Sequence, residues 1–137
     1  MPVTFLTEGV SFPPIKRREI SIWIKQIAHL YGKEVYEIAY IFCSDQVILE
    51  MNRKYLQHDY YTDIITFDYS EHNTISGDIF ISIDTVKSNA KEFEINFANE
   101  LYRVIIHGIL HLCGLKDATE EEKKMMRERE NEALLLI

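Results

Sequence analysis

The segment NFANELYRVIIHGILHLC, residues 96–113, has helical periodicity and is almost wholly apolar after Arg103. A helix that is apolar around most of its circumference is enclosed by the other elements of its protein. The segment therefore predicts a central helix. Gly114 is placed to end it, as a glycine just past a helix C-terminus commonly does.

The chain before this helix alternates strands with helices. Residues 3–7 and 34–43 are rich in β-branched and aromatic side chains and are predicted to be strands. Residues 15–31 have the apolar spacing of a helix. Ser44 is positioned to cap a second, short helix that runs to about Tyr55.

Two further β-branched runs, residues 63–69 and 77–83, are separated by a polar loop and predict neighbouring strands. Helical spacing recurs over residues 84–93 and over the charged residues 119–136. We therefore expect an α/β (α+β) fold. It would be a single domain over residues 1–137, with a small mixed four-stranded sheet packed by helices.

The composition is that of a globular protein, with 137 residues and 47% hydrophobic side chains. The chain has no leader-like start, and its apolar runs are too short to span a bilayer. We expect a soluble, cytoplasmic protein with no membrane partner. The two cysteines, Cys43 and Cys113, are far apart, which excludes a disulfide framework and a four-cysteine zinc site.

The net charge of −7 argues against a protein that coats nucleic acid through bulk electrostatics. Residues 1–58 carry seven basic and six acidic side chains (+1), and residues 59–137 carry eight and sixteen (−8). Any site for a polyanion must therefore be local. The clusters Lys16-Arg17-Arg18 and Arg53-Lys54 are candidates, and a solvated surface is their alternative interpretation.

His107 and His111 are four residues apart on one face of the central helix, so both imidazoles can reach one ion. The alternative is two core histidines that donate hydrogen bonds to backbone carbonyls. Burying a polar group without a partner is costly, and two such groups on an otherwise apolar helix favour a shared ligand.

Asp117 lies three residues after Gly114, where a tight turn would carry its carboxylate back over the histidines. The segment HGILHLCGLKD matches the long zincin pattern, in which a helical His-x-x-x-His is followed by Gly and then by a third ligand. Three protein ligands with an open position are typical of catalytic zinc. Asp117 could instead cap the next helix, but Thr119 and Glu122 form a capping box for that purpose.

Zinc peptidases carry a glutamate base directly after the first histidine, where this chain has Gly108, so a protease is disfavoured. A helix-interior glycine costs about 1 kcal/mol relative to Ala, which indicates a close approach to the backbone or tight packing. Two histidines and a carboxylate also describe ferrous oxygen-activating sites. The expected cofactor is one divalent ion per chain, with the helical spacing favouring Zn²⁺.

The block from His107 to Gly114 matches in full the signature His-Gly-x-Leu-His-Leu-x-Gly of the YbeY family of bacterial endoribonucleases and ribosomal-RNA maturation factors. The chain resembles this family over about residues 34–135. The other matching blocks, in the family's order, are Met51-Asn-Arg-Lys-Tyr55, Asp59, Thr62-Asp-Ile-Ile-Thr-Phe67 and Gly77-Asp-Ile79.

The resemblance implies a metal-dependent, single-strand-specific endoribonuclease that acts in ribosomal-RNA processing and ribosome maturation. RNA would be its substrate and the small ribosomal subunit a further partner. A metal-activated water would cleave the phosphodiester. Two alternatives stay open: a non-catalytic RNA or ribosome assembly factor with a structural metal, and a hydrolase of small molecules or peptides.

Two positions depart from the family pattern. The family usually has histidine as third ligand, preceded by Tyr-Asp, whereas this chain has Leu115-Lys116-Asp117. The family also typically has arginine where this chain has Leu56. Arg53 lies one helical turn earlier, and we interpret it as a candidate catalytic residue that presents its guanidinium to the same place.

Phosphate contacts by basic side chains dominate nucleic-acid affinity. The basic residues of the first half, Arg17, Arg18 and Lys54, are therefore predicted to bind RNA. The carboxy-terminal helix has six glutamates against four basic residues. We expect that helix to face away from RNA and to serve packing and solubility.

Overall fold

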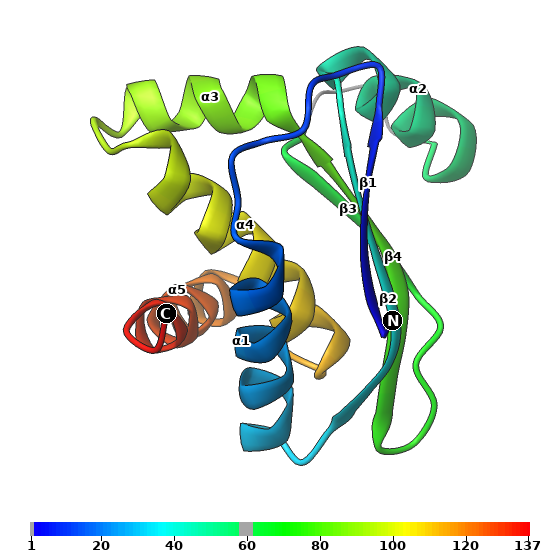
Figure 1. Ribbon diagram of the computed structural model, residues 1–137, viewed down its shortest axis with the longest axis vertical. Coiled ribbons are helices and arrows are strands. Elements are labelled where there is room, and N and C mark those ends of the chain that lie inside the picture. The colour runs from blue at the N-terminus through cyan, green and yellow to red at the C-terminus, as the bar shows by residue number, and fades with distance from the viewer. Residues whose placement is uncertain (1, 58–61) are drawn as a thin grey trace.

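The computed structural model describes residues 2–57 and 62–137. Within these ranges the chain forms one four-stranded sheet and five helices (Figure 1). In chain order the elements are β1 (Val3–Glu8), α1 (Arg17–Leu30), β2 (Glu34–Cys43), α2 (Asp45–Tyr55), β3 (Ile64–Asp68), β4 (Thr74–Ser82), α3 (Ile83–Glu92), α4 (Phe97–Leu112) and α5 (Glu120–Leu134).

The sheet is mixed, and its strand order is β1-β2-β4-β3. β1 and β4 both run parallel to β2, whereas β3 runs antiparallel to β4 as the other arm of a hairpin. β1 and β3 are therefore the two edge strands. A cavity lies beside the β3 edge and is lined in part by residues of β3.

The two faces of the sheet bury separate cores. α1, α4 and α5 lie on one face and α2 lies on the other (Figure 1). Ile48 of α2 packs with Ile65 and Phe80 on its face, through side chains that alternate with those of the main core. On the main-core face, the fully buried sheet residues are Ile38, Tyr40, Phe42, Ile75, Ile79 and Ile81.

α4 is the predicted central helix, and a hydrogen bond and close packing fix its position against the sheet. The Tyr40 hydroxyl donates a hydrogen bond to the Ile105 carbonyl at 2.8 Å. A Cβ at Gly108 would lie 3.0 Å from Ile79 Cδ1 and 3.2 Å from Ile64 Cδ1. Tight packing against the sheet therefore accounts for the glycine inside this helix.

α5 closes the main core from the outside. The Trp23 indole donates to the Ala133 carbonyl at 2.9 Å, which ties the last turn of α5 to α1. The first turn is fixed by a capping box, in which the Thr119 side chain accepts from Glu122 N at 3.1 Å and the Glu122 side chain accepts from Thr119 N at 2.9 Å. This predicted cap is confirmed.

The structure confirms the predicted α/β fold with its mixed four-stranded sheet. β4 departs most from expectation, since it begins three residues early. The reason is a tight hairpin, in which Glu71 and Thr74 exchange backbone hydrogen bonds of 3.0 and 2.9 Å. Both cysteines are free. Among the helices described, none combines the length and apolar character that crossing a membrane requires.

Candidate metal centre

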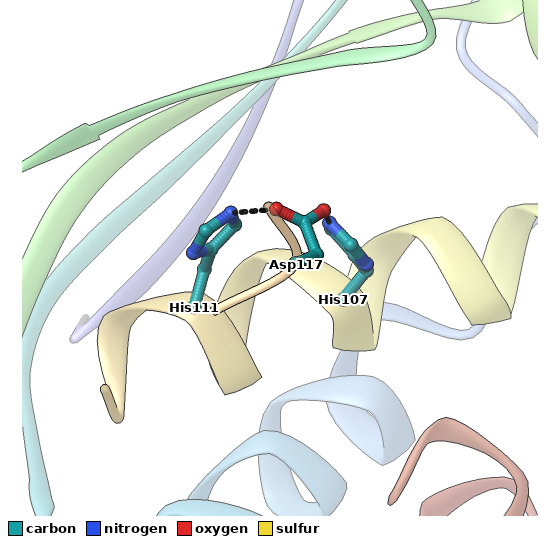
Figure 2. A group of neighbouring side chains, drawn as sticks. All are labelled: His107, His111 and Asp117. Atoms are coloured by element: carbon teal, nitrogen blue, oxygen red, sulfur yellow. Dashed lines mark ion pairs between the residues drawn. The ribbon is translucent and has the colours of Figure 1, made fainter. Parts of the chain in front are cut away.

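The second half of α4 and the turn after it bring three candidate ligands together. His107 and His111 are one helical turn apart, and their rings meet edge to face with centroids 5.3 Å apart. α4 ends at Leu112, and Gly114 then adopts a φ of +105°, in the left-handed region that favours glycine. This conformation turns the chain back, so that Asp117 lies over the histidines (Figure 2).

The geometry of these three side chains fits a divalent metal. His107 Nε2 is 3.3 Å from Asp117 Oδ2, and His111 Nε2 is 3.4 Å from Asp117 Oδ1. One donor atom from each residue lies within 4.8 Å of the other two. Ligands held tetrahedrally at about 2.0–2.1 Å from zinc are about 3.3–3.4 Å apart. Each histidine nitrogen lies at such a distance from one Asp117 oxygen, but the two nitrogens approach different oxygens, so binding one ion would need a rearrangement of these side chains.

Glu130 of α5 forms a hydrogen bond with His107 on the side of the ring that faces away from Asp117. Its Oε2 lies 2.7 Å from His107 Nδ1, and a carboxylate can only accept, so Nδ1 carries the proton. His107 Nε2 then faces Asp117, where a metal would sit. A carboxylate behind a metal-binding histidine is a recurrent arrangement that fixes the ring and its tautomer.

Glu130 is itself buried and held by Arg103, whose Nη1 donates to Oε1 at 3.0 Å, while Nη2 donates to Asn131 at 2.8 Å. Burial acts to raise the pKa of Glu130, but the hydrogen bonds and charges of His107 and Arg103 outweigh it and lower that pKa. Burial acts to lower the pKa of His107, but Glu130, Asp117 and Asp63 together raise it. Arg103 of α4 and Glu130 of α5 thus cooperate to orient the imidazole of His107.

The three candidate ligands line a cavity of about 610 Å³. Its walls come from β3 and the residues before it, one face of α4, and α5, with the ends of α2 and α3 at its margins. The cavity therefore follows the open edge of the sheet. A volume of this size accommodates a ligand as large as a nucleotide.

Three further carboxylates, those of Asp63, Asp68 and Glu100, line this cavity, and none of them was assigned a role from the sequence. Burial raises the pKa of Asp63, which directly precedes β3. Glu100, on α4, is 4% exposed, and its Oε1 has no hydrogen-bond partner among the described residues. Burial, followed by the charge of Asp63, raises the pKa of Glu100 as well. Glu100 could have been found from the sequence as an acidic residue seven positions before His107, which places both on the same face of a helix.

The basic residues predicted to contact RNA lie elsewhere. Arg53 and Lys54 are exposed in the last turn of α2 and do not line the cavity. Their neighbours Asn52 and Leu56 do line it. Arg17, with its guanidinium 4.0 Å over the Phe12 ring, and Arg18 are exposed at the start of α1, also outside the cavity lining. Asp59, part of the matching blocks, lies outside the described residues.

The carboxy-terminal helix, which we expected to face away from RNA, supplies one wall of the cavity through Lys123, Met126, Arg127 and Glu130. Its composition did not indicate this position because its acidic side chains differ in burial. Glu130 is buried beside His107, whereas the glutamates of the first turn are mostly exposed.

Comparisons with known proteins identify the family of the chain and agree with its fold. Residues 9–137 match the family model described as "Endoribonuclease YbeY". The chain is 62% identical to the "Endoribonuclease YbeY" of Phocaeicola vulgatus, covering 98% of both chains, and 60% identical to that of Bacteroides thetaiotaomicron, covering 99% of both. The solution structure of TM1509 from Thermotoga maritima superposes with a TM-score of 0.64 at 27% identity, covering 96% of this chain and 88% of that one.

Proposed function

The chain belongs to the YbeY family of endoribonucleases, and from that premise we propose that it cleaves RNA with a Zn²⁺ ion held by His107, His111 and Asp117. One observation carries the assignment of these ligands. One donor atom from each residue lies within 4.8 Å of the other two, and Glu130 fixes the far side of His107. Three protein ligands leave a fourth position for water or substrate.

A bound divalent ion would lower the pKa of water towards neutrality and offset charge on the attacked phosphoryl oxygen. The residues of the chain prepare that chemistry. Glu130 keeps a proton on His107 Nδ1 and so keeps Nε2 available. Asp117 brings a negative charge where the family usually has a neutral histidine, which lowers the net charge of the loaded site by one. Gly108 leaves no side chain to act as a peptidase-type base.

The substrate is RNA, and the cavity offers cations for it despite the overall charge of −7. Arg103, Lys123 and Arg127 all line it. We propose that these residues, more than Arg17, Arg18 and Lys54, meet the phosphates nearest the cleaved bond. Arg53 stays a prediction for the outer margin of the same site.

The biological setting belongs to the same proposal. The chain would act as one domain over residues 1–137 in the cytoplasm, on ribosomal RNA during maturation of the small ribosomal subunit. Family membership supports this setting.

The decisive experiment measures cleavage of a single-stranded RNA by purified protein with and without one equivalent of Zn²⁺. Asp117→Ala should lose both tight zinc binding and cleavage. Asp117→His should keep zinc binding, because it restores the usual family ligand. Glu121→Ala, an exposed carboxylate four residues along the chain, is the matched control. Tight binding of zinc and RNA without turnover would instead favour an assembly factor with a structural metal.

A further inference from the structure

The cavity extends well beyond the candidate ligands. Glu100 lies seven residues before His107, which is two helical turns on the same face of α4, and both side chains line the cavity. At 1.5 Å per residue, this separates them by about 10 Å along the helix. The far end is bounded by Asn89 and Phe93 of the α3 region. That end takes no part in holding the metal.

Glu100 is the first distinctive feature of the far end. It is 4% exposed, yet its Oε1 accepts no hydrogen bond from the described residues. A buried acceptor without a donor costs about 1–3 kcal/mol, so such a group implies a partner in the working state. Arg103 donates to Glu130 and Asn131 in the structure and forms no hydrogen bond with Glu100 Oε1.

Phe93 is the second feature. It is the C-cap residue of α3, and although aromatic it is 52% exposed while lining the cavity. Asn89 lies one turn earlier and lines the same end. A flat apolar ring, an amide and a carboxylate acceptor are the groups with which proteins bind an unstacked nucleobase: the ring stacks, and the polar groups meet the base edge.

We propose that this far end is a nucleobase subsite, in which a base of the RNA stacks on Phe93 and donates an N–H hydrogen bond to Glu100. Carboxylates accept from exocyclic amino groups of bases. Cytosine, adenine and guanine have such a group, whereas uracil offers only its N3–H, which is flanked by two carbonyl oxygens that repel a carboxylate. The subsite therefore favours an amino-bearing base, next to the cleaved bond, over uracil. This inference rests on the proposed function, since it names the substrate preference of the same cavity.

Cleavage of matched oligonucleotides tests the preference. We would use single-stranded RNAs that are uridine throughout except for one cytidine, and compare each cleavage rate with that of the all-uridine strand. Wild-type protein should cut next to the cytidine about tenfold faster. Glu100→Gln presents both a donor and an acceptor, so the preference should fall to about twofold or less. Glu92→Gln, an exposed carboxylate of α3 outside the cavity lining, should keep the preference.

The stacking half of the proposal has its own variant. Phe93→Ala should weaken binding of every strand by roughly 5- to 150-fold, seen as a raised KM. Tyr36→Ala removes an aromatic ring that is 70% exposed outside this cavity and should leave KM unchanged. Thermal unfolding of each variant verifies that it is folded. An unchanged KM for folded Phe93→Ala overturns the stacking role.

A direct binding measurement separates this inference from the proposed function. NMR titration of zinc-loaded protein with cytidine and uridine monophosphates should shift the amides of residues 89–100 more strongly for cytidine. Cleavage without base preference, unaltered by Glu100→Gln, overturns the subsite and leaves the nuclease standing. Selective cytidine binding without any cleavage supports the subsite and overturns the nuclease. Two zinc ions in wild type and one in Glu100→Gln would assign Glu100 to a second metal and overturn the subsite.

Discussion

Replacing Glu130 should weaken zinc binding although Glu130 is not a candidate ligand. Its Oε2 lies 2.7 Å from His107 Nδ1 and fixes both the ring and the tautomer. Loss of a carboxylate behind a metal-binding histidine typically costs 10- to 100-fold in affinity. We therefore expect Glu130→Ala to bind zinc about 10- to 100-fold more weakly, which is about 1.4–2.7 kcal/mol.

The same substitution should also destabilise the fold. It leaves the buried side of His107 and one Arg103 nitrogen without an acceptor, although Arg103 keeps its 2.8 Å bond to Asn131. Breaking a buried ion pair by removing one partner costs about 3–5 kcal/mol. The remaining bond and the partial exposure of Arg103 place the expected loss at about 2–3 kcal/mol.

Glu130→Gln separates the two effects. The amide oxygen can still accept from His107, while the amide NH₂ faces the Arg103 guanidinium, donor against donor. Zinc affinity should fall less than tenfold, whereas the free energy of unfolding should fall nearly as far as in Glu130→Ala. Competition with a chromophoric chelator measures affinity, and urea unfolding of the metal-free protein measures stability. Glu128→Ala, an exposed neighbour on α5, is the control. Zinc affinity of Glu130→Ala within twofold of wild type would refute the positioning role.

Four further outcomes are expected. Gly108→Ala should lower the free energy of unfolding by about 1–3 kcal/mol in thermal or urea unfolding, because its Cβ would lie 3.0 Å from Ile79 and overpack the sheet; a stabilised variant would contradict this. Burial raises the pKa of Cys43 to about 12 and of Cys113 to about 11, so iodoacetamide at pH 8 should label both slowly in the native protein and rapidly in urea. Zinc at a hundred times its Kd should stabilise the protein by about 2.7 kcal/mol, seen as a raised Tm that EDTA reverses. Arg53→Ala should flatten the log–log salt dependence of RNA binding by about 0.7 if this side chain contacts one phosphate, and an unchanged slope would remove it from the site.

The elements with a strong local signal were predictable from the sequence. β2 has its predicted bounds, and Ser44 and Thr119 cap their helices as expected, because periodicity and capping depend on neighbours in the chain. The convergence of the candidate ligands His107, His111 and Asp117 was predictable for the same reason. Their spacing is local, and a glycine at position 114 indicates the turn that ends the helix.

The residues behind and beside the metal donors were not predictable, since they depend on how α5 packs across α4. Glu130 is one of several glutamates in a charged helix, and no spacing marks it as the one that meets His107 from 23 residues away. Glu100 is similarly hidden, because its burial depends on the elements that pack around α4 and not on its neighbours in the chain. The basic clusters of the first half lie outside the cavity lining, and composition could not show this because it gives no information on which surface borders the cavity.

Asp117 lies on a short turn that also carries Thr119, the cap of the next helix. Metal binding and order in the first turn of α5 are consequently linked. The free energy by which an ordered turn strengthens metal binding through Asp117 equals the free energy by which the bound ion stabilises the turn. Removal of the ion would therefore loosen the first turn of α5, and faster hydrogen exchange of its amides would show this.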